Sequence, residues 1–490
     1  MCVEIRLATT RISPLKVKLG VLRGIHEKGG LLAMAKFLLL PLTLLSLFVA
    51  PLLADEPIVI LLTTEAKRLP VYLAPWTKSK GPNELTNNHI QELLGALCFD
   101  LDVCGSLEIA GATKERAAQA AVERELSQFD AARWKSLGLL YLVRGEVTGK
   151  SLVVTLHGVA AGRTLATYTL PLSGSLPSDR RQIHTLSDAI HKTLFGKEGI
   201  AKTRILYTLR HPTTGAENWD SEVWIADYDG HNAAPLTREG SYCVTPTFLP
   251  PASGKASGSF LYTCYRVGQS KIYAAPLSDG LGRRLITLRG NQLMPVVSKQ
   301  RDKIAFVSDA GGNPDLFIQP FTPETGAIGK PTQVFSAPHG AQASPSFSPD
   351  GKRLAFASNK DGQPRIYIMD LPKEGDSSKP TPKLITLRNR ENTSPAWSPD
   401  GTKIAYSALS DGVRQIWIYD LQTDRESQLT TGPGHKENPS WAPDSLHLVF
   451  NSATVTSSDL YLVNLNQPSA IQITSGPGEK RFPSWEPQER

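Results

Sequence analysis

Short apolar runs with period-two spacing recur through the second half of the chain, and they predict β-strands. In six segments a proline stands two residues before an apolar, usually aromatic, residue. These pairs are Pro246/Phe248, Pro295/Val297, Pro345/Phe347, Pro395/Trp397, Pro439/Trp441 and Pro483/Trp485. Successive prolines lie 49, 50, 50, 44 and 44 residues apart. A repeat of this length, with turn residues between its apolar runs, is typical of a β-propeller blade.

Two further strands are predicted in each repeat. An apolar-x-aromatic triplet begins the second strand, at residues 205–207, 260–262, 304–306, 354–356, 404–406 and 448–450. A third apolar run follows at residues 223–225, 272–274, 316–318, 366–368, 416–418 and 460–462. The spacing therefore predicts six blades over residues 201–490.

The two ends of the repeat region complement each other. The first triplet, at residue 205, has no proline-containing strand before it, and the last such strand, at residues 482–485, has no triplet after it. We expect the C-terminal strand to complete the first blade, because closing the ring removes exposed sheet edges.

Residues 55–200 lack the blade pattern and predict a small α/β domain. Strands are expected at residues 58–62, 69–74, 139–143, 152–156 and 165–170, and a helix at residues 84–100. Ser178 is the expected N-cap of a last helix that Gly196 ends. The predicted fold class is α+β with two domains, the α/β domain at 55–200 and the six-bladed propeller at 201–490.

The N-terminal residues are typical of an export signal. Residues 34–54 combine Lys36 with an apolar run at 37–53 and a small residue, Ala54, at the expected cleavage site. As a helix this run would extend about 25 Å, less than a bilayer core of about 30 Å. We expect a cleaved signal peptide and no stable membrane span after cleavage, with an N-terminal membrane anchor as the alternative. Residues 1–33 show no structural pattern and are interpreted as an over-long gene model.

The net charge of +7 does not indicate a nucleic-acid-binding protein. Residues 1–54 hold seven basic and two acidic side chains, so the remaining chain carries 46 basic and 44 acidic ones. The mature chain is nearly neutral and offers no global electrostatic attraction for nucleic acid.

Four cysteines remain after the predicted cleavage, an even number that suits an oxidising compartment. Cys243 and Cys264 fall at cross-strand positions of one blade hairpin, so we predict a disulfide between them. Cys98 and Cys104 either pair or serve as small apolar residues. The absence of a CxxC pair disfavours zinc.

Three stretches carry a resemblance to a known family: residues 194–207, 222–232 and 481–487. In them the chain resembles the TolB family, the propeller proteins of the Tol-Pal envelope system. The resemblance implies a periplasmic scaffold without catalytic residues, metal or cofactor, which supports outer-membrane integrity and constriction during cell division. The implied partners are the peptidoglycan-associated lipoprotein Pal, TolA and other outer-membrane lipoproteins.

The resemblance also implies two binding regions. Pal would dock at one mouth of the propeller channel, on the loops before the inner strands, with solvated turns as the alternative. The expected contact residues are Asn291, Met294, His339, Ala343, Asn392, Thr393, His435 and Asn438. TolA would bind the mature N-terminus, at Asp55, Glu56, Ile58, Val59 and Ile60, unless that segment forms the first strand of the domain.

The sequence bears on two other classes of function. The sequence has no Gly-x-Ser-x-Gly elbow, no H-E-x-x-H pair and no phosphate loop. A propeller enzyme of the lyase or lactonase type and a peptidoglycan- or sugar-binding module remain the alternatives. The two Ser-Pro-Asp-Gly stretches, at 348–351 and 398–401, are expected to be hairpin turns rather than calcium loops.

Overall fold

A computed structural model describes residues 68–79, 85–126, 129–212, 219–372 and 380–488. All of them belong to one compact unit, Val59–Arg490. The predicted signal peptide, the upstream residues 1–33 and the predicted strand at 58–62 lie outside the described residues. No helix in the described ranges is long and apolar enough to cross a membrane.

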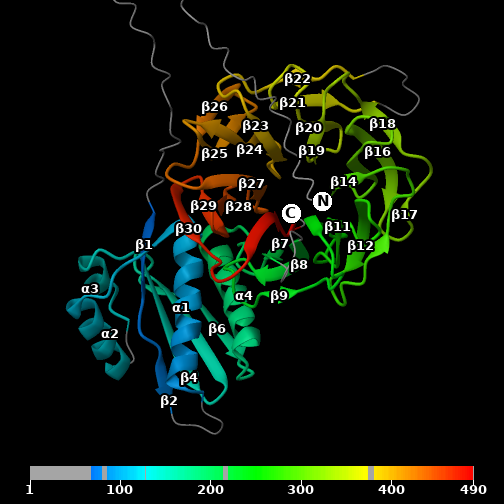
Figure 1. Cartoon of the computed structure of the whole chain (residues 1–490). Helices are drawn as coiled ribbons and strands as arrows, with labels where there is room; N and C mark the ends of the chain where they lie inside the picture. Colours follow the sequence, from blue (N-terminus) through cyan, green and yellow to red (C-terminus); the bar gives the residue numbers. More distant parts are fainter. Residues whose placement is uncertain (1–67, 80–84, 127–128, 213–218, 373–379, 489–490) are drawn as a thin grey trace, which may run out of the picture. The chain divides into compact units, whose positions relative to one another are not determined.

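A mixed sheet forms the first part of the described chain (Figure 1). Its order is β3-β1-β4-β5-β6, with β2 beside β4. The strands are β1 Leu69–Leu73, β2 Thr77–Ser79, β3 Leu107–Ile109, β4 Tyr141–Thr148, β5 Ser151–Gly158 and β6 Arg163–Pro171. Strand β1 runs parallel to β3 and β4, whereas β4, β5 and β6 are antiparallel neighbours.

Helices cover both faces of this sheet because its strands alternate their apolar side chains. Val71 packs in a core with residues of α1, Asn87–Val103, and α4, Leu176–Phe195. Its neighbour Tyr72 points to the other face and packs with residues of α2, Lys114–Leu126, and α3, Ala131–Ser136. The first part of the chain is therefore a three-layer α/β arrangement.

The structure corrects the start of two predicted helices. Helix α1 begins after Thr86, whose hydroxyl accepts a hydrogen bond from the His89 amide, three residues later than predicted. Helix α4 begins after Ser175 rather than Ser178, because Pro177 fits the first turn of a helix, where no backbone donor is needed. Gly196 ends α4 as predicted, in the left-handed conformation (φ 68°).

Six four- or five-stranded antiparallel sheets follow within the described part of the chain. The first blade holds β31 Glu479–Trp485, β7 Arg204–Pro212, β8 Trp219–Asp227 and β9 Ala234–Pro235. The second holds β10 Cys243–Phe248, β11 Ser259–Cys264, β12 Lys271–Pro276 and β13 Arg283–Arg284; the third β14 Gln292–Val297, β15 Lys303–Ser308, β16 Asp315–Thr322, β17 Gly326–Ala327 and β18 Thr332–Phe335. The fourth holds β19 Gln342–Phe347, β20 Arg353–Ser358, β21 Arg365–Asp370 and β22 Lys383–Leu384. The fifth holds β23 Asn392–Trp397, β24 Lys403–Ser410, β25 Val413–Asp420 and β26 Arg425–Gln428, and the sixth β27 His435–Trp441, β28 His447–Ala453, β29 Ser458–Asn464 and β30 Gln467–Gln472.

The C-terminal strand closes the ring, as the two unmatched ends predicted. Strand β31, at the red end of the chain in Figure 1, pairs with β7 so that Trp485 lies opposite Ile205. The Trp485 indole also donates a hydrogen bond to the Thr203 hydroxyl at 2.8 Å, and its amide donates to the Ser440 hydroxyl of the sixth blade at 2.9 Å. The predicted fold class, a six-bladed propeller after an α/β region, is confirmed.

Most of the propeller core lies between neighbouring blades. Trp397, two residues after its proline, packs with Ile366 of the preceding blade and with Ile404 of its own. Trp441 and Trp485 occupy equivalent places in the next two blade interfaces. All three indoles are buried, so the aromatic half of the sequence repeat is first of all a packing element.

Candidate functional site

Each inner strand of the propeller contains the same backbone irregularity. The residue just before the repeated proline has a positive φ, although it is never glycine: Thr245 (49°), Met294 (52°), Ser344 (50°), Ser394 (52°), Asn438 (55°) and Phe482 (52°). The pairing register shifts at this point in all six inner strands, which marks a β-bulge. Positive φ is unfavourable for a non-glycine residue, and a following proline disfavours it further. Strain that recurs around the ring is typical of a site that serves binding.

The bulges form the wall of a shallow depression in the propeller channel. It has a volume of about 180 Å³ and is lined by the six positive-φ residues with the prolines and residues that follow them. Contacts run from blade to blade along this wall. The Ser344 amide donates to the Met294 sulfur at 3.2 Å, and the Ser394 hydroxyl donates to Asn438 Oδ1 at 3.0 Å. The depression is therefore a single surface to which all six blades contribute.

A buried polar side chain stands three residues before five of the six prolines and holds the loop that precedes its strand. The amide of Gln292 donates to the Leu288 carbonyl at 2.6 Å, and that of Asn392 donates to the Asn389 carbonyl at 2.7 Å. The ammonium groups of Lys436 and Lys480 donate to the Pro433 carbonyl at 2.8 Å and the Gly476 carbonyl at 2.6 Å. Burial lowers the pKa of Lys436. These side chains fix the loops around the channel mouth, a role that sequence reasoning missed.

The predicted Pal-contact residues fall into four structural groups. Met294 and Asn438 line the channel depression. His339 and His435 are exposed on the surrounding loops, and His435 Nδ1 accepts a hydrogen bond from the Arg414 amide at 3.2 Å. The partly exposed Ala343 lies one residue before a bulge.

The other three predicted residues are engaged inside the protein. The backbone amide and the side-chain amide of Asn291 both donate hydrogen bonds to the Asp309 carboxylate, each at 2.6 Å. Asn392 is fully buried, and Thr393 beside it is partly buried. The structure thus gives Asn291 and Asn392 an evident role in holding the loops, next to the surface on which a partner would contact Met294 and Asn438.

Ion pairs surround the same mouth and were not anticipated from the sequence. Arg414 reaches Glu391 at 3.1 Å and Glu437 at 3.4 Å. In the closing strand, Glu479 contacts Arg481 at 3.1 Å. Glu437 and Arg481 directly precede Asn438 and Phe482, which line the channel. A charged residue just before the channel-lining residue was the one sequence feature that could have predicted this rim. The mouth combines an uncharged centre with a charged rim, as protein-binding surfaces commonly do.

The opposite mouth of the channel has a different lining. A cavity of about 640 Å³ lies there between Phe347, Trp397, Trp441 and Trp485 and the prolines of the inner turns. The Ser-Pro-Asp-Gly stretches form these turns, as predicted. In the first of them the Ser348 hydroxyl and the Lys352 amide both donate to the Asp350 carboxylate, which stabilises the turn.

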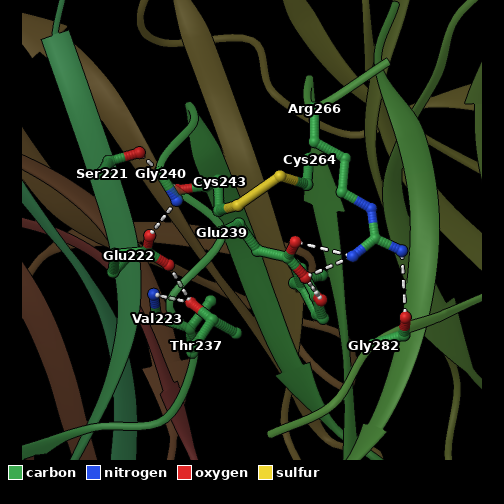
Figure 2. Close-up of a disulfide and its surroundings, with 11 residues drawn as sticks. Ser221, Glu222, Val223, Thr237, Glu239, Gly240, Cys243, Cys264, Arg266 and Gly282 are labelled. Carbon is green, nitrogen blue, oxygen red and sulfur yellow. Dashed lines mark hydrogen bonds and ion pairs between the residues drawn. A yellow bond between two sulfur atoms is a disulfide. The ribbon is translucent and has the colours of Figure 1, made fainter.

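Cys243 and Cys264 form a disulfide across the hairpin of the second blade (Figure 2). Both side chains are fully buried. The Ser221 hydroxyl, from the first blade, donates to the Cys243 carbonyl at 2.6 Å. On the other side Arg266 pairs with Glu239 at 2.6 Å. Figure 2 shows the bridge between these two groups, so it lies where the first two blades meet.

Cys98 and Cys104 do not pair with each other. Both are free and partly buried, one in helix α1 and one just after its end. The Cys104 thiol donates to the Leu101 carbonyl at 3.0 Å, and burial raises its pKa to about 11. This favours the interpretation of the two as small, mostly apolar side chains.

One group of described side chains has the residue types of a metal site. The ligand atoms of His184, Asp227 and Asp229 lie within 4.8 Å of one another. Asp229 is already ion-paired with Arg180, however, and Asp227 accepts a hydrogen bond from the Asn232 amide. Both carboxylates thus already have protein partners, and these residues form a buried polar junction.

The segment expected to bind TolA lies outside the described residues. Asp55, Glu56, Ile58, Val59 and Ile60 all precede Arg68, where the described chain begins. Their role stays a prediction.

Comparison with known proteins places the propeller in a family. Residues 191–489 match the family described as the TolB beta propeller domain. A TolB homologue from Protochlamydia amoebophila is 50% identical over 299 residues, 60% of this chain and 63% of the relative. One from Chlamydia pneumoniae is 37% identical over 293 residues, 60% of this chain and 62% of the relative. The chain thus matches less than two thirds of the length of these relatives.

A solved structure extends the likeness in fold. The crystal structure of TolB from Acinetobacter baumannii superposes with a TM-score of 0.67 and covers 88% of this chain and 99% of that one. The sequence identity is 23%, so this likeness concerns the fold.

Proposed function

The chain belongs to the TolB β-propeller family, and on that premise we propose that it is a periplasmic scaffold of the Tol-Pal envelope system. In this role it binds other proteins and catalyses no reaction. It supports the integrity of the outer membrane and constriction at cell division by joining a Pal-type lipoprotein to TolA.

The six-fold bulge at the channel mouth is the observation that carries the proposal. Six non-glycine residues with positive φ give up favourable backbone geometry, and the surface that they form faces the channel. A depression of about 180 Å³ is small for an enzyme's substrate pocket, which commonly measures about 300–1,000 Å³. It suits one or two side chains of a protein that sits on the rim.

The rim supplies complementary polarity for such a partner. Arg414 lies between Glu391 and Glu437, and all three side chains are partly exposed. Charged rims of this kind steer a partner and fix its orientation, while the desolvated centre supplies most of the affinity. We assign Met294, Ala343 and Asn438 to the centre of the Pal contact and His339 and His435 to its edge.

A capture experiment tests the proposal. Residues 55–490 are immobilised and exposed to a detergent extract of the organism's own envelope, and retained proteins are identified by mass spectrometry. We expect a Pal-type lipoprotein and TolA among them. Deletion of residues 55–64 should remove TolA and leave the lipoprotein. Retention of neither protein would contradict the scaffold, and unchanged TolA binding after the deletion would contradict the N-terminal assignment.

A further inference from the structure

A buried group of ionisable side chains joins the α/β part of the chain to the first propeller blade. We call it the junction cluster: Asp100 of α1, Arg180 and His184 of α4, and Tyr228 and Asp229 in the turn after β8. Each of the five is at most 5% exposed. Ionisable groups are rarely buried to this extent without a specific arrangement of partners.

His184 lies at the centre of the cluster with a carboxylate at each ring nitrogen. Its Nδ1 is 2.9 Å from Asp100 Oδ2, and its Nε2 is 3.5 Å from Asp229 Oδ2. The ring also meets Tyr228 edge-on, with the ring centres 5.6 Å apart. A neutral imidazole has one N–H donor and one lone pair, so one of its nitrogens would present a lone pair to a carboxylate. The Nε2–Asp229 contact is an ion-pair distance rather than a hydrogen bond, and a doubly protonated ring is attracted to both carboxylates.

The end of helix α1 explains why a positive charge is needed here. Its last turn carries Asp100 and Asp102 and no basic residue. The C-terminal end of a helix is partly negative, so acidic residues there are unfavourable unless a cation compensates them. Arg68 meets Asp102 at 3.2 Å. Asp100 faces His184, which comes from another helix, with its Oδ2 2.9 Å from the ring's Nδ1.

Both acidic and basic side chains lie around the His184 ring. Asp227, the last residue of β8, and Asp188, on α4 itself, are further carboxylates, and Asp229 is shared with Arg180 and His231. Burial raises the pKa of Asp188 to about 6. Tyr228 donates its hydroxyl to Asp100 Oδ1 at 2.8 Å. Burial alone would lower the pKa of His184, but hydrogen bonding to Asp100 and the charges of Asp100, Asp229 and Asp227 outweigh it and raise that pKa.

A second buried histidine lies at the same junction. His447 of β28 places Nδ1 2.5 Å from Asp444, and its Nε2 is 2.7 Å from both the Val103 carbonyl oxygen, at the end of α1, and the Asn464 amide nitrogen. The charge of Asp444 and the hydrogen bonds to Asp444 and Val103 outweigh burial and raise the pKa of His447. His184 differs at its second nitrogen, because Nε2 faces Asp229 at 3.5 Å and makes no hydrogen bond in the described structure.

We propose that the doubly protonated ring of His184 is a latch that holds α1 and α4 to the first blade, and that raising the pH releases it. The direction of this pH effect follows from the difference between the pKa of His184 in the folded and unfolded chain. A histidine with a raised pKa in the folded state contributes stability that is fully present below its unfolded pKa of about 6.5. That contribution is lost as the pH rises through the folded pKa. Burial also raises the pKa of Asp100, so the latch is closed where His184 is protonated and Asp100 is ionised, and it loosens on the alkaline side.

Nuclear magnetic resonance of the 15N-histidine-labelled full chain tests the latch directly. The His184 ring signals are assigned by their absence in His184→Gln. We expect both ring nitrogens of His184 to be protonated at pH 6.5 and the ring to titrate above that value. A neutral ring at pH 6.5 would overturn the proposal. The measurement on the native chain decides this point even if the variant folds poorly, because the expected protonation pattern is itself distinctive.

Hydrogen exchange tests the mechanical consequence. After correction for the intrinsic pH dependence, amides of residues 97–103 and 227–231 should lose protection between pH 6.5 and 9 in the native chain. His184→Gln should show the weaker protection at both pH values, whereas the control His211→Gln, an exposed histidine of β7, should behave like the native chain. Equal protection of the native chain at both pH values would contradict the latch. A rise in thermal stability with added Zn²⁺ that His184→Gln abolishes would replace it with a metal site.

Discussion

The disulfide of the second blade gives the most quantitative prediction. Replacing both Cys243 and Cys264 by serine removes a cross-link between residues 21 positions apart in the sequence. The loop-closure entropy of a loop of that size corresponds to about 3 kcal/mol of stability. Both side chains are fully buried, so solvent does not replace the lost contact. We expect the free energy of unfolding to fall by about 3 kcal/mol in urea denaturation without reductant.

Neighbouring blades suggest a matched control for this variant. The residues equivalent to Cys243 and Cys264 in the fourth blade are Gln342 and Ser358, which face each other in the same register, and the Ser358 hydroxyl donates to Gln342 Oε1 at 2.6 Å. A Cys243→Gln/Cys264→Ser variant copies this pair. It should recover about 1 kcal/mol relative to the double serine, the usual contribution of one hydrogen bond.

Two results would refute this reasoning. Thiol titration of the unfolded, unreduced chain from residue 55 should find two free cysteines, and a count of four would show that the bridge does not form. Alternatively, if the double serine variant unfolds at the same urea concentration as the native chain, the bridge contributes no stability. Replacing the free Cys98 and Cys104 by serine should change the stability by less than the double serine at the disulfide.

Substitutions of Gly230 and Trp485 test packing at the ring closure, with a third substitution, at Gly412, as the control. Gly230→Ala should destabilise the protein by more than about 2 kcal/mol, because φ is 83° and the new Cβ would lie 1.7 Å from the Ile473 carbonyl oxygen. The control Gly412→Ala should cost about 1 kcal/mol, because Gly412 has a similar φ of 81° but open space around it. Equal losses in thermal denaturation would contradict this close approach of the first and sixth blades. Trp485→Ala should cost about 4 kcal/mol, since the indole is buried and donates to Thr203, and a loss below 1 kcal/mol in denaturant titration would mean that the last strand does not close the ring.

Much of the propeller was predictable because its blades repeat a simple pattern. The proline and the aromatic residue two positions later mark the inner strand in almost every blade, and the unmatched ends at residues 205 and 485 predicted the closure. The outermost strands β9, β13 and β22 were missed because each has two residues, too few for a period-two pattern. Helix α2 was missed because its sequence is polar and rich in alanine, which gives little apolar periodicity.

The channel wall could not be predicted, for a physical reason. A residue before proline is expected to be extended, so Thr245 or Met294 would be assigned to an ordinary strand. Their positive φ exists only because the surrounding blades enforce it. The buried junction was hidden for a similar reason. Asp100, His184 and Asp229 lie far apart in the sequence, and nothing local shows that they meet.

Isothermal titration calorimetry with the soluble domain of the organism's Pal-type lipoprotein measures whether the channel wall binds this partner. The variants are the native chain, a Met294→Gly/Asn438→Gly chain and a Lys299→Ala chain. Glycine suits the positive φ at both channel positions, so the double variant removes the side chains without adding strain. Lys299 is exposed at the opposite mouth and serves as the control. The account predicts one-to-one binding by the native chain and the control, with affinity lowered at least about tenfold in the double glycine variant, which corresponds to one lost central contact of about 1.4 kcal/mol. No binding by the native chain, or equal affinity of all three, would contradict it.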